Sequence, residues 1–70
     1  MHKFYKLYHK DYTGKQYAIS YYLISDGVVY MHYNNPEFGR GWANQGVMGI
    51  DWIPGHCEEI TMGDLMVDLL

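Results

Sequence analysis

An Asp-Gly pair at residues 26–27 separates two stretches that are typical of β-strands. Residues 17–24 (YAISYYLI) and 28–33 (VVYMHY) are rich in β-branched and aromatic side chains, which favour extended backbone. Asp-Gly tolerates the positive φ angles of a type I′ turn, whose twist matches that of the flanking strands. The pattern therefore predicts an antiparallel hairpin in which Leu23 faces Tyr30.

A second turn signal adds a third strand before this hairpin. Residues 11–15 (DYTGK) suit a type I turn that ends with glycine in the left-handed region, which makes a three-residue hairpin loop. The three strands are then expected to form a meander over residues 2–33. A regular ladder from the first loop places Tyr5 opposite Tyr21.

Neither face of the predicted meander is polar. The face with the denser aliphatic set is predicted to form the core, and it contains Tyr5, Leu7, His9, Tyr17, Ile19, Tyr21, Leu23, Val28, Tyr30 and His32. The opposite face is predicted to remain for a partner, and it contains Phe4, Lys6, Tyr8, Ala18, Ser20, Tyr22, Ile24, Val29, Met31 and Tyr33. Only 37 residues follow Tyr33, so we expect some aromatic surface to stay uncovered.

Residues 34–57 are rich in glycine and are predicted to form a flexible loop. Residues 34–36 (NNP) end the preceding strand, because proline cannot donate to a β-ladder and Asn-Pro favours a turn. Residues 47–53 (VMGIDWI) are a candidate for a short fourth strand, which Pro54 would stop.

The tail, residues 61–70, is predicted to be a helix. Thr61 is a good N-cap, and Asp64 three residues later gives a weaker version of the capping box. A strand over this tail is the alternative. Four apolar residues share one helical face, namely Met62, Leu65, Met66 and Leu69. Residues 1–70 are thus expected to form one α+β domain, a three- to four-stranded antiparallel meander with a short C-terminal helix packed on it.

The charge is small in total but unevenly distributed along the chain. The net charge is −3, and residues 1–25 carry +3, residues 26–50 carry −1 and residues 51–70 carry −5. A negative chain is a poor match for duplex DNA, whose binding proteins need many phosphate contacts. We therefore do not expect duplex DNA as a partner.

The sequence shows no clear signal for membrane insertion, secretion or disulfide formation. The longest apolar run, residues 21–24, is far shorter than the roughly 20 residues of a membrane span. The first ten residues lack the apolar region of a signal peptide. A single cysteine cannot form an internal disulfide, so we expect a reduced, cytoplasmic environment and no membrane contact.

No motif in the sequence indicates catalysis, a cofactor or a metal ion. Cys57 has no protease or redox signature around it, and Glu58-Glu59 shows no acid–base spacing. Residues 38–42 (FGRGW) are neither a Walker A motif nor a dinucleotide fingerprint. Zinc needs three or four converging ligands, and no metal-ligand spacing links the histidines, which are His2, His9, His32 and His56.

Residues 38–42 are nevertheless the most distinctive segment, because they hold the only arginine, Arg40, between two glycines and two aromatic residues. Arginine, tryptophan and tyrosine dominate binding hot spots, and the chain has eight tyrosines. Packing of Phe38 and Trp42 onto an open sheet face as core is the competing interpretation. The predicted partner-binding residues are Phe4, Tyr8, Tyr22, Tyr33, Phe38, Arg40 and Trp42.

These features favour a non-enzymatic module that binds another protein, or a second copy of itself, by occupying its surface. In size, single-domain build and lack of catalytic motifs the chain resembles small acidic accessory proteins of bacteriophages and mobile elements, including anti-defence inhibitors. The resemblance implies an inhibitory role. A single-stranded nucleic-acid contact is the second interpretation, and a very small enzyme is the third. The nucleic-acid contact would use the tyrosines for stacking and four cations for phosphates, namely Lys3, Lys6, Lys10 and Arg40.

Overall fold

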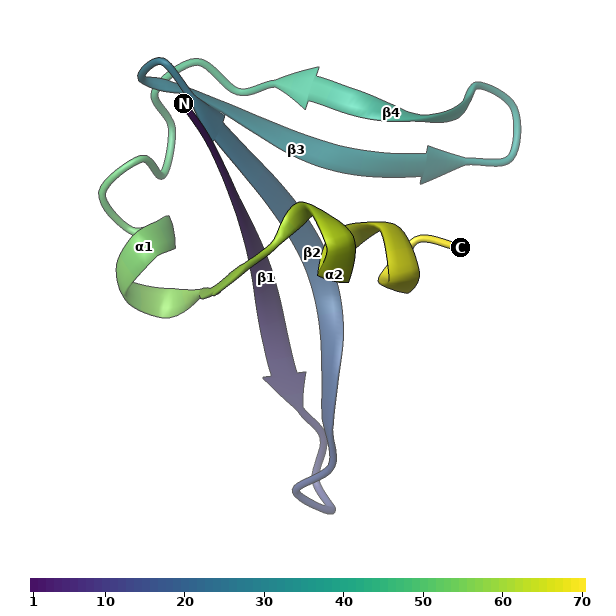
Figure 1. Cartoon of the computed structure of the whole chain (residues 1–70). Coiled ribbons are helices and arrows are strands. Elements are labelled where there is room, and N and C mark those ends of the chain that lie inside the picture. Colours follow the sequence, from purple (N-terminus) through teal and green to yellow (C-terminus); the bar gives the residue numbers. More distant parts are fainter.

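Five antiparallel strands form one sheet in the order β4-β3-β2-β1-β5, with two short helices that follow β4 and β5 in the chain (Figure 1). The computed structural model describes the backbone of residues 1–70 and every side chain except those of Ala18 and Ile19. The predicted positions of these two side chains on the sheet faces therefore lie outside the described residues. The elements are β1 (His2–Lys10), β2 (Gln16–Ser25), β3 (Val28–Asn35), β4 (Gly39–Asn44), α1 (Ile53–His56), β5 (Glu58–Ile60) and α2 (Met62–Asp68).

The predicted α+β architecture, an antiparallel sheet with a short C-terminal helix, is confirmed. The turn between β2 and β3 has Asp26 at φ 51° and Gly27 at φ 75°, as a type I′ turn requires. Leu23 faces Tyr30 as predicted. Positive φ at both central residues gives the connection the twist that the paired strands need.

The turn between β1 and β2 is also the predicted one. Gly14 has φ 84°, and its N–H donates to the Asp11 carbonyl at 3.0 Å. The Asp11 carboxylate accepts hydrogen bonds from the backbone N–H groups of Thr13 (2.9 Å) and Lys15 (3.0 Å). Hydrogen bonding, above all from the Thr13 side chain, holds the pKa of Asp11 below its ordinary value.

The register between β1 and β2 departs from a regular ladder. It shifts by one residue between Leu7 and Tyr8, so one extra residue lies in β2. Tyr5 consequently faces Tyr22, and the predicted pairing of Tyr5 with Tyr21 is wrong. Side chains alternate between the two faces along a strand. A shift of one residue therefore pairs residues 2–7 of β1 with the opposite set of β2 side chains from the one that a regular ladder predicts.

The shift changes which face of the sheet forms the core. Tyr5 (5% exposed), Val29 (1%) and Ile53 (2%) are buried together, and Tyr22 and Ile24 pack against them. The prediction that the face with Tyr22, Ile24 and Val29 remains for a partner is therefore wrong. The register shift brings Tyr5 onto this face, and α1 supplies Ile53 to cover it.

The segment between β3 and α1, predicted to be a flexible loop, contains a strand and a series of turns. It contains β4, which pairs with β3 although its sequence, GRGWAN, has little intrinsic β-propensity. The predicted strand over residues 47–53 is wrong, because this stretch forms successive turns that lead into α1. Gly46 and Gly49 have φ angles of 64° and 79°, which interrupt an extended conformation.

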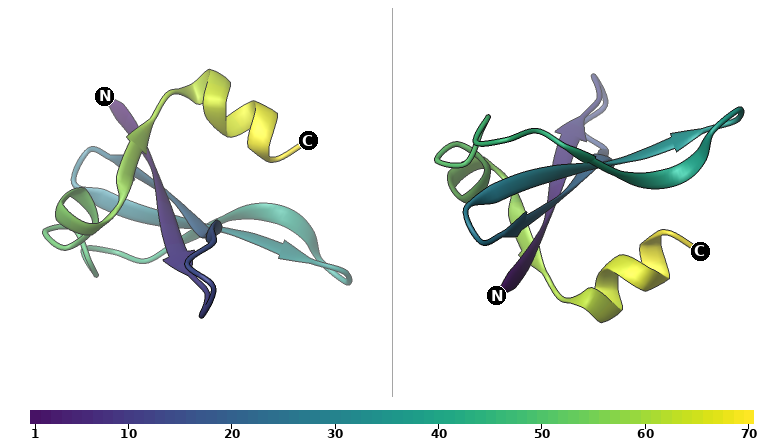
Figure 2. Two further views of the ribbon diagram at one scale, coloured as in Figure 1. Left: turned by 90° about the horizontal axis from the view of Figure 1, so that it is seen from below. Right: turned by 90° about the horizontal axis from the view of Figure 1, so that it is seen from above.

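Helix α2 begins as predicted. The Thr61 hydroxyl accepts from the Asp64 N–H at 3.0 Å, and the Asp64 carboxylate accepts from the Thr61 N–H at 3.2 Å, which completes a capping box. The strand alternative for the tail is therefore wrong. Figure 2 shows α1 and α2 at separate places along the sheet, joined by β5.

We expect Gly27→Ala and Gly55→Ala to change stability in opposite directions, although neither new Cβ meets a neighbour within 4 Å. Alanine at position 27 must adopt a left-handed conformation, which costs about 1–2 kcal/mol. Alanine at position 55 lies in α1 and is expected to gain roughly 0.5–1 kcal/mol. Thermal melting measures both, and a Gly27→Ala variant as stable as the parent would contradict the turn assignment.

Candidate functional site

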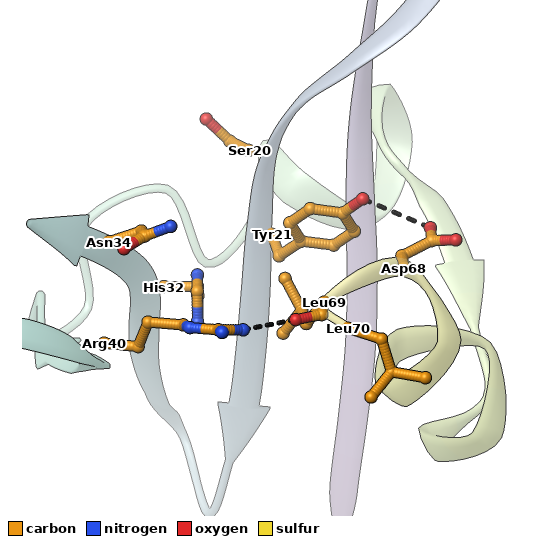
Figure 3. Close-up of a pocket in the computed structure, with 8 residues that line it drawn as sticks. All are labelled: Ser20, Tyr21, His32, Asn34, Arg40, Asp68, Leu69 and Leu70. Carbon is orange, nitrogen blue, oxygen red and sulfur yellow. Dashed lines mark hydrogen bonds between the residues drawn. The ribbon is translucent and has the colours of Figure 1, made fainter.

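Three polar contacts hold the end of α2 against the sheet. The Lys6 ammonium of β1 donates to the Asp68 carboxylate, to which the Tyr21 hydroxyl of β2 also donates at 3.1 Å. The Arg40 guanidinium of β4 donates to the carbonyl of Leu69. Figure 3 shows Tyr21 and Arg40 reaching these two successive positions of the chain. Contacts from three strands therefore fix the orientation of α2.

The three side chains at this contact, Lys6, Tyr21 and Asp68, keep their protonation states around neutral pH. The hydrogen bond from Lys6 holds the pKa of Asp68 below its ordinary value, and the same bond raises the pKa of the Lys6 ammonium. Burial, followed by the hydrogen bond to Asp68, raises the pKa of the Tyr21 hydroxyl. Asp68 is thus ionised and Tyr21 is protonated at neutral pH, as the observed hydrogen bonds require.

Helix α2 exposes three large apolar side chains. Met62 (54% exposed), Met66 (64%) and Val67 (70%) are the residues that we call the outer stripe. The prediction that Met62 and Met66 share the packed face with Leu65 and Leu69 is wrong. Residues advance about 100° around a helix, so Leu65 and Leu69 point inward while the methionines lie at the edge of that face.

The C-terminal third of the chain also exposes acidic side chains. Glu58 and Glu59 of β5 and Asp64 of α2 are exposed. In the described structure, Asp68 is the only acidic residue of positions 51–70 that forms an ion pair. The surface around α2 therefore combines exposed apolar groups with uncompensated negative charge.

A polar cleft of about 410 Å³ lies between the end of α2 and strands β2, β3 and β4 (Figure 3). Arg40 is a predicted site residue, whereas its neighbours in the cleft are not, because they come together from four separate elements of the fold. Burial lowers the pKa of His32, whose ring stands edge-on to Trp42 at a centroid distance of 5.1 Å. The cleft is lined by Ser20, Tyr21, His32, Asn34, Arg40, Asp68, Leu69 and Leu70.

A second apolar surface covers the core side of the sheet. Val47 (70% exposed), Met48 (74%) and Trp52 (45%) lie in the turns before α1. The Trp52 ring stacks on the His56 ring at 4.4 Å. A small cavity of about 160 Å³ lies under this segment, next to Tyr22.

The predicted partner-binding residues do not form one surface. Phe4, Arg40 and Trp42 lie on the side of the sheet that α2 covers, and the rings of Phe4 and Trp42 are 6.3 Å apart. Both rings are partly buried, in line with the competing interpretation of Trp42 as core. Tyr8 is partly buried, with the Lys6 ammonium 4.9 Å from its ring centroid.

The remaining three predicted residues lie elsewhere. Tyr22 packs against the core, and Tyr33 (39% exposed) lies over Gly41, where a Cβ would meet its hydroxyl oxygen at 2.6 Å. Phe38 (78% exposed) is in the turn between β3 and β4. The predicted partner-binding residues thus lie on both sides of the sheet and in the turn between β3 and β4.

Two of the four cations proposed for a nucleic-acid contact are already engaged. Lys6 binds Asp68 and Arg40 binds the Leu69 carbonyl, whereas Lys3 and Lys10 are exposed. Burial raises the pKa of the partly buried Cys57 thiol, which packs against the core. Within the described side chains, no three histidine, cysteine or carboxylate groups come together as a metal site.

Comparisons with protein-family models, curated proteins and solved structures found no match to the chain. In the part of the chain that the structure describes, neither helix has the length and apolar character needed to cross a bilayer.

We expect Leu65→Ala to destabilise the fold and Met66→Ala to leave it almost unchanged. Leu65 is 6% exposed, so truncation opens a cavity that costs about 2–4 kcal/mol, whereas Met66 is 64% exposed. Chemical denaturation measures both free energies of unfolding. Equal losses in the two variants would contradict the observed orientation of α2.

We expect Asp68→Asn to lower the Tm above pH 5 and to have a shrinking effect in acid. The pKa of Asp68 is lowered in the folded state, so its contribution is present above its ordinary value and is lost as pH falls through the lower folded value. The raised pKa of Lys6 preserves the pair on the alkaline side up to its ordinary value near 10.5. A difference in Tm between parent and variant that stays constant into strong acid would contradict this contribution of the ion pair.

Proposed function

We propose that the chain is a non-enzymatic protein-binding module that occupies a partner's surface through the outer stripe of α2. The observation that carries this proposal is the exposure of three apolar side chains, Met62, Met66 and Val67, on a helix with only one buried residue. Contiguous exposed apolar groups are typical of interaction surfaces, and Met62 and Met66 are neighbours at positions i and i+4 of the helix. Methionine side chains are flexible and polarisable, which suits contact with another protein.

The charges around the outer stripe indicate the chemistry of the partner. Residues 51–70 carry five acidic side chains and no lysine or arginine. A partner with an apolar groove flanked by basic residues would complement both features, as in helix-in-groove recognition. A second copy of the chain fits less well, because it would bring two acidic surfaces together. This charge argument favours a different protein over self-association.

The alternative, a single-stranded nucleic-acid contact, has weaker support. Lys6 and Arg40, which would contact phosphates, are held by α2. Salt dependence separates the two functions, because phosphate contacts weaken steeply with ionic strength while apolar contacts do not.

Val67→Asp is expected to abolish partner binding and Val47→Asp to preserve it. The two valines are matched, because each is 70% exposed and neither belongs to the buried core. The full chain and both variants are used to capture proteins from nuclease-treated lysate of the native host. A protein that the parent and Val47→Asp retain is then purified and titrated calorimetrically. We expect at least about a tenfold rise in Kd for Val67→Asp, as for a hot-spot residue.

Three outcomes would overturn the proposal. The first is equal loss of binding in both variants, and the second is no protein retained by the parent. The third is binding that a single-stranded oligonucleotide displaces, which would favour the nucleic-acid alternative. Melting curves of both variants show whether each one is folded, so loss of binding is not confused with loss of structure.

A further inference from the structure

The small cavity of about 160 Å³ on the core side of the sheet connects solvent to the buried core. Its lining includes Val29 and Ile53, which are 1% and 2% exposed and belong to the core. It also includes Met48 and Trp52, which are exposed and therefore lie at its entrance. A molecule of suitable size can thus enter from solvent and contact side chains of the core.

Backbone hydrogen bonds hold one wall of this cavity in place. The Gln45 N–H donates to the Val29 carbonyl at 2.7 Å, and the Val29 N–H donates to the Gly46 carbonyl at 2.8 Å. The Ile53 N–H donates to the Gly49 carbonyl at 2.8 Å. The segment that forms the wall is therefore bonded to β3 at its start and packed into the core at its end. A preformed site of this kind binds a ligand without the entropic cost of ordering a loop.

The lining of the cavity favours a ligand without charge. None of the described residues that line it carries a charge. The side-chain amide of Gln45, at the edge of the cavity, donates to the Ala43 carbonyl at 3.4 Å. An ionised group in the cavity would lose its hydration and find no counter-charge, which is costly in apolar surroundings. The ligand is therefore expected to be neutral.

Size and side-chain contacts favour an aromatic ring. An apolar cavity of about 150 Å³ in a protein core is large enough for benzene, whereas drug-sized ligands occupy sites of about 300 Å³ or more. A volume of about 160 Å³ therefore admits one ring. Tyr22 and Trp52 bring aromatic rings to the lining, and Met31 and Met48 bring thioether sulfur atoms. Both kinds of group make favourable contacts with an aromatic ring.

We propose that this cavity binds a small, neutral molecule with a single aromatic ring. The ring packs against Val29 and Ile53, and the Trp52 side chain covers it at the entrance. A free molecule fits better than the aromatic side chain of a protein partner, because a side chain would bring polar peptide groups against an apolar entrance. The site is independent of the proposed function, because none of the residues that line it belongs to the outer stripe.

The test uses three probes that share one ring, each with the full chain. These are toluene, the anion benzoate, and N-acetylphenylalaninamide, which carries the ring of toluene on a peptide backbone. Chemical-shift changes of backbone amides in an NMR titration report both the place and the Kd of binding. We expect toluene to shift amides around Val29, Gly49 and Trp52, and to bind at least about tenfold more tightly than either of the other probes.

Trp52→Ala is expected to weaken toluene binding several-fold, because it removes a ring from the entrance. Its matched control is Phe38→Ala, which removes an exposed ring outside the cavity and should bind toluene like the parent. Met48→Asp places a charge at the entrance and is also expected to weaken binding several-fold. Its matched control is Met66→Asp, the same change at an exposed methionine of the outer stripe, which should bind toluene normally. The dispersion of the amide spectra shows that each variant is folded.

The proposal is overturned if toluene shifts no amides around the cavity, or if Trp52→Ala and Met48→Asp both bind toluene like the parent. It is also overturned if benzoate binds as tightly as toluene. N-acetylphenylalaninamide binding as tightly as toluene would likewise overturn it and would assign the cavity to an aromatic side chain of a protein partner. Met66→Asp should lose the partner of the outer stripe and retain toluene, so failure of this site and failure of the proposed function are distinguishable.

Discussion

The one-residue shift between β1 and β2 is the constraint on which the rest of the structure depends. It places Tyr5 opposite Tyr22, which completes the buried core beneath α1. It also places Lys6 opposite Tyr21, so both side chains reach Asp68 at the end of α2. In a regular ladder these two residues would lie on opposite faces of the sheet, and the helix would lose one of its polar anchors.

A chain of 70 residues can cover both faces of its sheet only with very short elements. Helix α1 has four residues and covers the core face, while α2 has seven and covers the other. A helix as short as α2 buries a narrow arc, here centred on Leu65, and the rest of its surface stays in solvent. The exposure of Met66 and Val67 thus follows from the geometry that attaches the helix.

Helix α2 consequently separates two chemically different regions. The helix exposes apolar side chains and Asp64, whereas its end closes a polar cleft in which Arg40 binds the Leu69 carbonyl. We infer that the outer stripe suits a partner surface that is large, apolar and flanked by basic residues.

The sequence by itself determined the features that depend on neighbouring residues. The Asp26-Gly27 turn, the glycine-closed loop at residues 11–15 and the capping box at Thr61 all follow from local backbone preferences. Only the tertiary structure decided which face is buried and that β4 pairs with β3 despite a weak strand sequence. The physical reason is that side chains alternate along a strand, so one extra residue in β2 reassigns a face without leaving a local signal.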